Sequence, residues 1–218
     1  MVRRLNRFAA EVESDGQLAL AHVPNSGRLG ELLYPGAPVL LAPRTGPRKT
    51  AFDLLLARQG EQLACIDARL PGLLLEEALL AGQLPDLGPF TAVHREVAYG
   101  SSRLDLLGEG AGGLCYIECK SVTLVREGVA LFPDAPTLRG VRHLEELQHA
   151  AHSGHRAAIV FVIQREDAQS LRPYAENDPA FAAALHRAAA TVQVLAYACR
   201  VTGEEIAIAR RVPVDLSA

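Results

Sequence analysis

The stretch LCYIECKSV, residues 114–122, is an apolar run of strand character that two charged residues, Glu118 and Lys120, interrupt. Side chains two positions apart in a β-strand point to the same face, so these two charges lie side by side. One interpretation is an ordinary half-exposed strand. The chain has 20 arginines but only two lysines, however, so a plain surface cation would more often be arginine. We therefore expect position 120 to require lysine, whose ammonium is a compact charge with a pKa that burial changes readily.

The segment before this stretch, SRLDLLGEGAGG at 102–113, predicts a second strand that folds back through the loop GEGAGG to pair with the first. Symmetric closure of that hairpin pairs Asp105 with Tyr116 and places Asp105 diagonal to Glu118. Diagonal neighbours on one face lie about 7–8 Å apart, so both carboxylates can approach one ion. Two hard-oxygen ligands beside Lys120 suit Mg²⁺ and a phosphate rather than Zn²⁺.

The segment after this stretch predicts a helix and then a central strand. Apolar residues recur at near-helical spacing over 136–153, and Gly154 follows the expected helix end. The apolar run AAIVFVI at 157–163 is typical of a parallel strand that is covered on both faces. We therefore expect Lys120 to project from a strand in the core of a mixed α/β sheet. The other elements that we expect in this part are strands at 93–99, 103–107 and 193–201 and a helix at 179–190.

The front of the chain has a different character. Residues 5–67 contain five segments that read as short strands separated by turn signals, which predicts a small β-barrel. The segment PGLLLEEALLAG at 71–82 predicts a helix with a glycine stop, and a linker follows it to Pro89. We therefore expect two domains, 1–82 and 83–218.

Composition limits the class of protein. With 218 residues, 49% hydrophobic and 22% charged, the chain can bury a substantial core. Its apolar stretches stay below the roughly 20 residues of a membrane span, and its start lacks the apolar segment of a signal peptide, so we expect a cytoplasmic protein with no membrane partner. Four cysteines in this context favour reduced, packed thiols. The pair Cys115 and Cys119 has no second pair or adjacent histidine, which argues against zinc.

The net charge of −3 hides an asymmetry along the chain. Residues 1–50 hold seven cations against four acids, a balance of +3, which leaves −6 for the remainder. A basic front end fits a domain that binds a polyanion such as DNA, although a solvated basic face explains it equally well. The best candidates for contacts with backbone phosphates there are Arg28, Arg44, Arg48 and Lys49.

Polar residues also gather at the start of the helix after the motif. Arg139, His143 and Thr137 lie on its first turns, where Arg139 in particular can contact a phosphate; a polar helix face is the alternative that we favour for the group. The front end has few aromatic residues. Their scarcity argues against a stacking platform for single-stranded nucleic acid.

The spacing of Asp105, Glu118 and Lys120, with a crossover helix directly after, matches the D…E-x-K arrangement of the PD-(D/E)xK nuclease superfamily. A structural, salt-bridged hairpin is the alternative. Longer blocks extend the resemblance over nearly the whole chain. These blocks are AHVPNSGRLGELLYPG (21–36), RKTAFDLLL (48–56), IDARLPGLLLEEAL (66–79), REVAYGSSRLDLL (95–107), YIECKSV (116–122) and LFPDAPTLRGVRHLEEL (131–147). In them the chain resembles the sugar fermentation stimulation protein A family.

The resemblance implies a fold and a site. The fold would be an N-terminal OB-fold joined to a restriction-endonuclease-like mixed α/β domain with DNA-binding behaviour. The site residues of the family would fall on Glu96, Asp105, Glu118 and Lys120. On this basis we expect Asp105 and Glu118 to hold one Mg²⁺ or Mn²⁺, with Glu96 completing the cluster directly or through water and the Cys119 carbonyl as a further ligand.

In that arrangement Lys120 would orient or help to deprotonate the attacking water and offset charge on the phosphate. DNA is the expected partner, and a homodimer remains open. The alternative function needs no catalysis: a DNA-binding or regulatory protein whose nuclease-like fold serves as a scaffold. A purely structural role is the least attractive, because facing carboxylates are costly without a cation.

Overall fold

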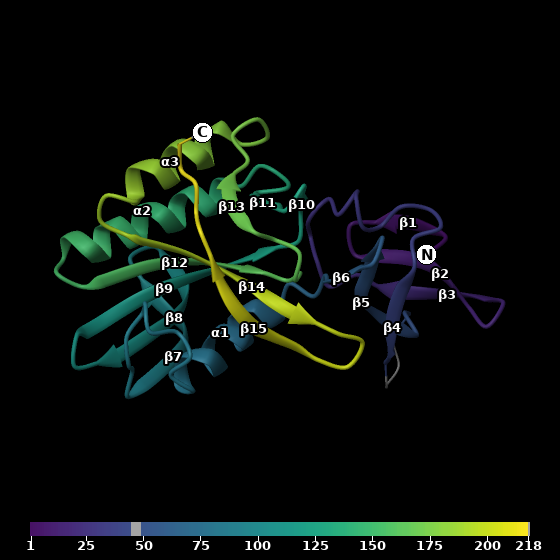
Figure 1. Ribbon diagram of the computed structural model, residues 1–218, viewed down its shortest axis with the longest axis horizontal. Helices are drawn as coiled ribbons and strands as arrows, with labels where there is room; N and C mark the ends of the chain where they lie inside the picture. Colours follow the sequence, from purple (N-terminus) through teal and green to yellow (C-terminus); the bar gives the residue numbers. More distant parts are fainter. Residues whose placement is uncertain (45–48, 218) are drawn as a thin grey trace.

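The structure, a computed structural model, describes residues 1–44 and 49–217. In this part of the chain, an N-terminal domain of short strands lies beside a larger domain that combines a sheet with helices (Figure 1). None of the described helices has the length and apolar character that a membrane span requires.

The N-terminal domain is a sheet of short strands in the order β1-β2-β3-β5-β4, with β6 paired to β5. Its alternating segments bury one face, on which Val12, Leu54 and Ile66 are fully enclosed. We expected five strands; the described residues form six, because the first expected strand is preceded by a hairpin partner, β1. The strands are β1 (Arg3–Asn6), β2 (Ala9–Ser14), β3 (Gln17–His22), β4 (Val39–Pro43), β5 (Phe52–Gln59) and β6 (Gln62–Cys65).

The second domain is built on a sheet in the order β15-β14-β12-β9-β8-β7. The three central strands β14, β12 and β9 run parallel, and the flanking strands are antiparallel. The strands are β7 (Ala92–Tyr99), β8 (Ser102–Gly110), β9 (Gly113–Val122), β12 (Arg156–Ile163), β14 (Gln193–Val201) and β15 (Ile206–Val212). A small second sheet contains β10 (Val125–Arg126), β11 (Val129–Phe132) and β13 (Ser170–Pro173).

Helices cover both faces of the large sheet, which explains the continuous apolar run of β12. On one face, α2 (Leu138–His152) and α3 (Pro179–Ala188) cover Ile159 and Phe161; on the other, α1 (Leu70–Leu80) covers Ala158 and Val160 (Figure 1). The crossover from β9 through α2 to β12 is the expected one, so the motif strand does lie in the sheet core.

The position of α1 differs from the expected domain boundary. A boundary after Gly82 would assign this helix to the N-terminal domain, but its buried residues Leu75 and Leu79 belong to the apolar core formed by β9, β12 and β14. The helix therefore packs with the second domain, because the outer face of that sheet has no other helical cover in the described residues.

Main-chain and side-chain contacts join the two domains. The Cys65 N–H, at the end of β6, donates to the Gln164 carbonyl just after β12, at 2.9 Å. The buried Arg165 guanidinium reaches back to Gln59 at 2.8 Å. On the opposite side, the Asp134 carboxylate accepts the Arg28 N–H at 2.9 Å.

This last contact depends on a glycine. A Cβ at Gly27 would lie 2.5 Å from Asp134 Oδ2, so only glycine allows the β3–β4 loop to approach so closely. Asp134, which the sequence places ahead of the α2 start, thus serves the domain interface; the helix itself is capped by Thr137, whose side chain accepts from the Gly140 N–H.

Candidate functional site

The hairpin that carries the site has a tighter turn than the sequence indicated. Gly110 pairs with Gly113, so only two residues form the loop, and Leu107 lies opposite Tyr116. The expected pairing of Asp105 with Tyr116 is therefore wrong by two positions. Because a shift of two preserves the faces, Asp105 still belongs beside Glu118, now directly across from it rather than diagonal.

The strands separate at Asp105. The ladder between β8 and β9 ends at Leu106, and the ladder between β7 and β8 omits the pair of Glu96 and Asp105. Glu96 has a φ of 54°, a left-handed conformation that non-glycine residues seldom adopt outside functional sites and turns. In place of a ladder bond, the Asp105 carboxylate accepts the Cys119 N–H at 2.8 Å, which aims it at the edge of β9.

Glu118 is the centre of a buried polar cluster. Its Oε1 accepts from Lys120 Nζ at 2.5 Å and from Nδ1 of His143, which comes from α2. The Glu118 side chain is 3% exposed and that of His143 is 5% exposed, so these contacts are formed away from water. Burial acts to raise the pKa of Glu118, but the hydrogen bond from His143 and the charge of Lys120 outweigh it and lower that pKa.

The pKa of Asp105 is shifted in the opposite direction. Burial, followed by the negative charge of Glu118, raises the pKa of Asp105 to about 6. The second carboxylate oxygen of Glu118, Oε2, is buried and has no hydrogen-bond partner among the described residues. A buried carboxylate oxygen without a partner, next to a second carboxylate, is a donor set that suits a hard divalent cation such as Mg²⁺ or Ca²⁺.

A pocket of about 320 Å³ opens beside these residues, lined by Glu96, Asp105 and the main chain around Cys119, with Arg69 and Arg95 on its rim. Glu96 thus shares a pocket with Asp105, but its side chain is 58% exposed and lies 3.9 Å from Arg103. The described residues contain no group of three or more His, Cys, Asp or Glu side chains arranged around one metal position. Two carboxylates and main-chain atoms are therefore the core of any cation site.

The expected phosphate contacts divide into several cases. Arg28 is exposed on the β3–β4 loop, and Arg139 is exposed on the first turn of α2. Lys49 is exposed, and Arg48 lies outside the described residues. Arg44 does not fit its expected role: its side chain is 15% exposed, and Nη1 is 2.9 Å from Asp53 Oδ1, so this guanidinium belongs to an ion pair of the fold.

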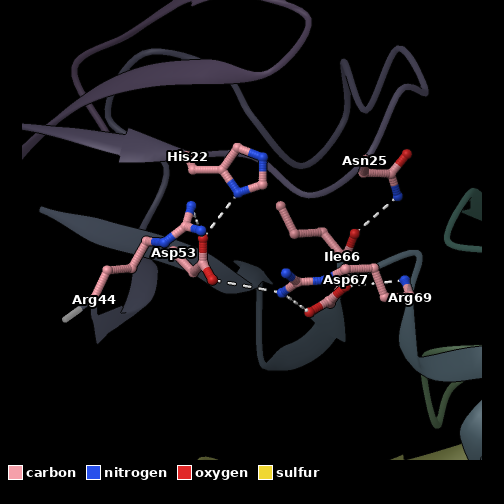
Figure 2. A network of polar contacts seen from close by, with 7 residues as sticks. All are labelled: His22, Asn25, Arg44, Asp53, Ile66, Asp67 and Arg69. Carbon is pink, nitrogen blue, oxygen red and sulfur yellow. Dashed lines mark hydrogen bonds and ion pairs between the residues drawn. The ribbon is translucent and has the colours of Figure 1, made fainter. Parts of the chain in front are cut away.

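Figure 2 shows the network to which Arg44 belongs. Asp53 accepts from His22 Nδ1 at 2.8 Å and lies 3.5 Å from Arg69 Nη2. Arg69 in turn binds the buried Asp67 carboxylate through Nε at 2.8 Å. Since Arg69 also lines the pocket beside Asp105, this network connects the N-terminal domain to the candidate site.

His143 is the site residue that the sequence interpretation placed wrongly, on a polar helix face. It is 4% exposed and faces the sheet with Leu144 and Leu147. The signal was present: the buried residues of α2 recur at 140, 143, 147 and 150, so the histidine lies on the apolar stripe. A histidine on such a stripe needs a buried polar partner, and Glu118 is that partner.

The fold and the site together define a two-domain protein in which an N-terminal OB domain precedes a mixed α/β domain. Family comparison gives the same division: residues 2–66 match the SfsA N-terminal OB domain, and residues 69–205 match the sugar fermentation stimulation protein RE domain. The chain therefore belongs to the sugar fermentation stimulation protein family, as its sequence blocks indicated.

Individual relatives agree over nearly the whole chain. Sugar fermentation stimulation protein homologs from Desulforamulus reducens and Moorella thermoacetica are 43% and 48% identical, covering 99% and 98% of this chain and 90% and 94% of their own. The solved structure of Pyrococcus furiosus SfsA in complex with Ca²⁺ is 33% identical, with a TM-score of 0.89, and the match covers 98% of this chain and 93% of that one.

Proposed function

We propose that the protein binds DNA and hydrolyses its phosphodiester bonds with the help of a divalent cation, Mg²⁺ or Mn²⁺, held at Asp105 and Glu118. One observation carries this proposal: the half-buried Asp105 carboxylate lies beside the buried Glu118 carboxylate on the adjoining strand, and Glu118 Oε2 has no partner among the described residues. Burial of such a pair is costly unless a cation compensates it.

The residues have separate roles in this proposal. Glu118 Oε2 and the Asp105 carboxylate would bind the cation, and Glu96 would complete the site from the same pocket, directly or through water. The Cys119 carbonyl is a further ligand, because the N–H and C=O of one strand residue point to the same neighbouring strand and the N–H points to Asp105. When bound, the cation supplies Lewis acidity and a water of lowered pKa.

Lys120 would act on the substrate. Its ammonium is 13% exposed, close to the carboxylates, and can offset charge on the phosphate and orient the attacking water. Because His143 also donates to Glu118 Oε1, that carboxylate keeps a partner when Lys120 turns towards the phosphate. Because His143 contacts Oε1, Oε2 of Glu118 would be the oxygen available to a cation.

A relative supports the choice of a hard divalent cation. Pyrococcus furiosus SfsA, which shares this fold over 98% of the chain, has been solved in complex with Ca²⁺. Ca²⁺ and Mg²⁺ both take carboxylate and carbonyl oxygens as ligands, which are the atoms that the Asp105 pocket offers.

A second candidate function is a non-catalytic DNA-binding protein on a nuclease-like scaffold. The observation in its favour is the internal pairing of Glu118 with Lys120 at 2.5 Å, which partly satisfies the acid without a cation. The described residues also lack a cluster of three metal-binding side chains. This function predicts DNA binding that Asp105 and Lys120 do not influence.

The deciding experiment is a cleavage assay on plasmid, linear, single-stranded and branched DNA with EDTA, Mg²⁺ or Mn²⁺. The wild type is compared with Asp105→Asn and Lys120→Met, and Arg187→Gln, at an exposed position in the last turn of α3, is the control. We expect metal-dependent cleavage in the wild type and the control and none in the two site variants. DNA binding without cleavage under every condition would overturn the nuclease proposal in favour of the scaffold.

A further inference from the structure

Three cavities near the domain interface share lining residues and therefore adjoin one another. The first, of about 330 Å³, lies between the two domains and is lined by Ser26, Gly27, Ser121 and Thr137. It shares Ser121 and Ala68 with the pocket beside Asp105. At its other end it shares Arg7, Ser26 and Pro136 with a more open hollow that also contains Arg28. We call these three adjoining cavities together the interdomain groove.

The two ends of the interdomain groove differ in charge. Arg7 and Arg28 are exposed at the open end, and the Arg28 guanidinium contacts only a neutral group, Asn177, at 3.5 Å among the described residues. The carboxylates Glu96 and Asp105 lie at the other end. A polyanion bound at the arginines would therefore extend towards the residues that bind a cation.

Two other charged groups of the groove are engaged in the fold. The Arg4 guanidinium donates to the carbonyls of Arg7 and Gly27, both at 2.9 Å, so it shapes the open end. The Asp134 carboxylate lines the groove, where it accepts the Arg28 N–H at 2.9 Å and so holds the loop. At the open end, Arg7 and Arg28 remain as the cations that can contact a ligand, whereas Arg69 and Arg95 at the other end lie beside Asp67 and Glu76.

The groove selects the form of nucleic acid. The cavity of about 330 Å³ between the two domains is about the size of one nucleotide, which favours a single strand over a duplex there. Phe132 is the aromatic residue that lines it, and its ring packs against Phe161 and Phe181 in the core, so it is not free to stack on a base. Recognition there would use the sugar-phosphate backbone and would not depend on base sequence.

We infer that the interdomain groove binds single-stranded DNA, with phosphates held by Arg7 and Arg28 and the strand passing Ser121 to reach Asp105. This inference rests on the proposed nuclease function and adds to it the substrate form and the residues that guide it. It also explains why the domains meet beside the acidic cluster.

Binding is tested with a fluorescent thymidine oligonucleotide by anisotropy in EDTA, so that cleavage does not interfere. Arg7→Gln and Arg28→Gln should each weaken binding about tenfold, and the double variant should reduce the slope of log K against log salt by about 1.4, or 0.7 for each lost phosphate contact. Arg187→Gln is the matched control, because this exposed arginine lies near the end of α3, away from the N-terminal domain (Figure 1). A duplex of the same length should bind more weakly.

The path is tested by protection of introduced cysteines from a maleimide reagent. Ser26→Cys in the groove should be protected by the oligonucleotide, whereas Ser153→Cys, exposed at the far end of α2, should react at the same rate with and without it. Equal reactivity of Ser26→Cys with and without bound DNA would overturn the path. Tighter binding of duplex DNA, or of RNA, would overturn the choice of ligand.

The outcomes separate this inference from the nuclease proposal. If the arginine variants lose binding but the wild type cleaves nothing with Mg²⁺ or Mn²⁺, the inference that the groove binds DNA is supported and the nuclease proposal is refuted. If the wild type cleaves DNA but Arg7→Gln and Arg28→Gln bind and cleave normally, the nuclease proposal is supported and the inference that the groove binds DNA is refuted.

Discussion

Arg139 Nε lies 3.2 Å from His143 Nε2, and this contact fixes the protonation of the histidine that supports Glu118. A guanidinium has donors but no acceptor, so His143 Nε2 must accept and carries no proton. The proton of the ring is therefore on Nδ1, which donates to Glu118 Oε1. Arg139, which we expected as a phosphate contact, thus also acts on the candidate site through His143.

We predict that Nδ1 of His143 carries the ring proton and that Nε2 accepts from Arg139. Long-range ¹H–¹⁵N correlation spectra of the protein labelled at histidine distinguish the two ring nitrogens by their shifts. In Arg139→Ala the restraint on Nε2 is removed, and the tautomer should become mixed. A signal for a protonated Nε2 in the wild type would contradict the proposed arrangement around Glu118.

Lys120 should contribute to stability as well as to function. Lys120→Met removes one of the two partners of a carboxylate that is 3% exposed, which should cost about 3 kcal/mol of the free energy of unfolding. Denaturant unfolding in EDTA measures this loss, with Lys49→Met as the control. Addition of Ca²⁺ should stabilise Lys120→Met more than the wild type, because a bound cation replaces the missing ammonium charge. An unchanged midpoint in EDTA would contradict the buried pair.

Asp105 should make the stability of the cation-free protein depend on pH. The pKa of Asp105 is raised to about 6 in the folded chain. Its contribution to the free energy of unfolding is therefore fully present below the unfolded pKa of 3.8 and is lost as the pH rises through about 6. Asp105→Asn lacks this titration. Relative to the wild type in EDTA, the free energy of unfolding of Asp105→Asn should therefore rise by on the order of 3 kcal/mol between pH 4 and 7.

Denaturant unfolding at several pH values measures this difference. Asp15→Asn, at the exposed β2–β3 turn, is the control variant. A difference between Asp105→Asn and the wild type that stays constant over this range would show that Asp105 is not held in a raised-pKa environment.

Gly27 should be far less tolerant of substitution than its neighbour Gly30. A Cβ at Gly27 would displace the Asp134 carboxylate from the N–H groups of Arg28 and Leu29, at a cost of about 2 kcal/mol. A Cβ at Gly30 would meet no atom within 4 Å, so Gly30→Ala should be neutral or stabilising by up to about 1 kcal/mol. Unfolding free energies of the two variants test this, and equal values would contradict the close approach of the loop.

The parts of the fold that the sequence predicted best are those where burial determines the pattern. The run at 157–163 is apolar on both faces because helices cover both, and the periodicity of 138–152 follows from its single buried stripe. The hairpin register was missed for a specific reason. Gly108 and Gly110 read as a loop, but they lie in β8 because Phe90 and Pro89 cross over them and leave no room for a Cβ.

The site was predictable in its types of residue and less so in their contacts. Strand alternation places Glu118 and Lys120 on one face, whereas Asp105 comes from the neighbouring strand and is held there by the Cys119 N–H. The ion pair of Arg44 with Asp53 joins neighbouring strands whose register depends on an irregularity at Leu40 and Leu41. Such irregularities arise from tertiary packing, which local sequence patterns do not encode.

The hydrogen bond from the Cys65 N–H to the Gln164 carbonyl makes one continuous backbone structure of two domains. Rotation of one domain against the other would have to break this main-chain hydrogen bond. If a DNA strand follows the groove, the scissile bond would lie at a constant number of nucleotides from the arginines.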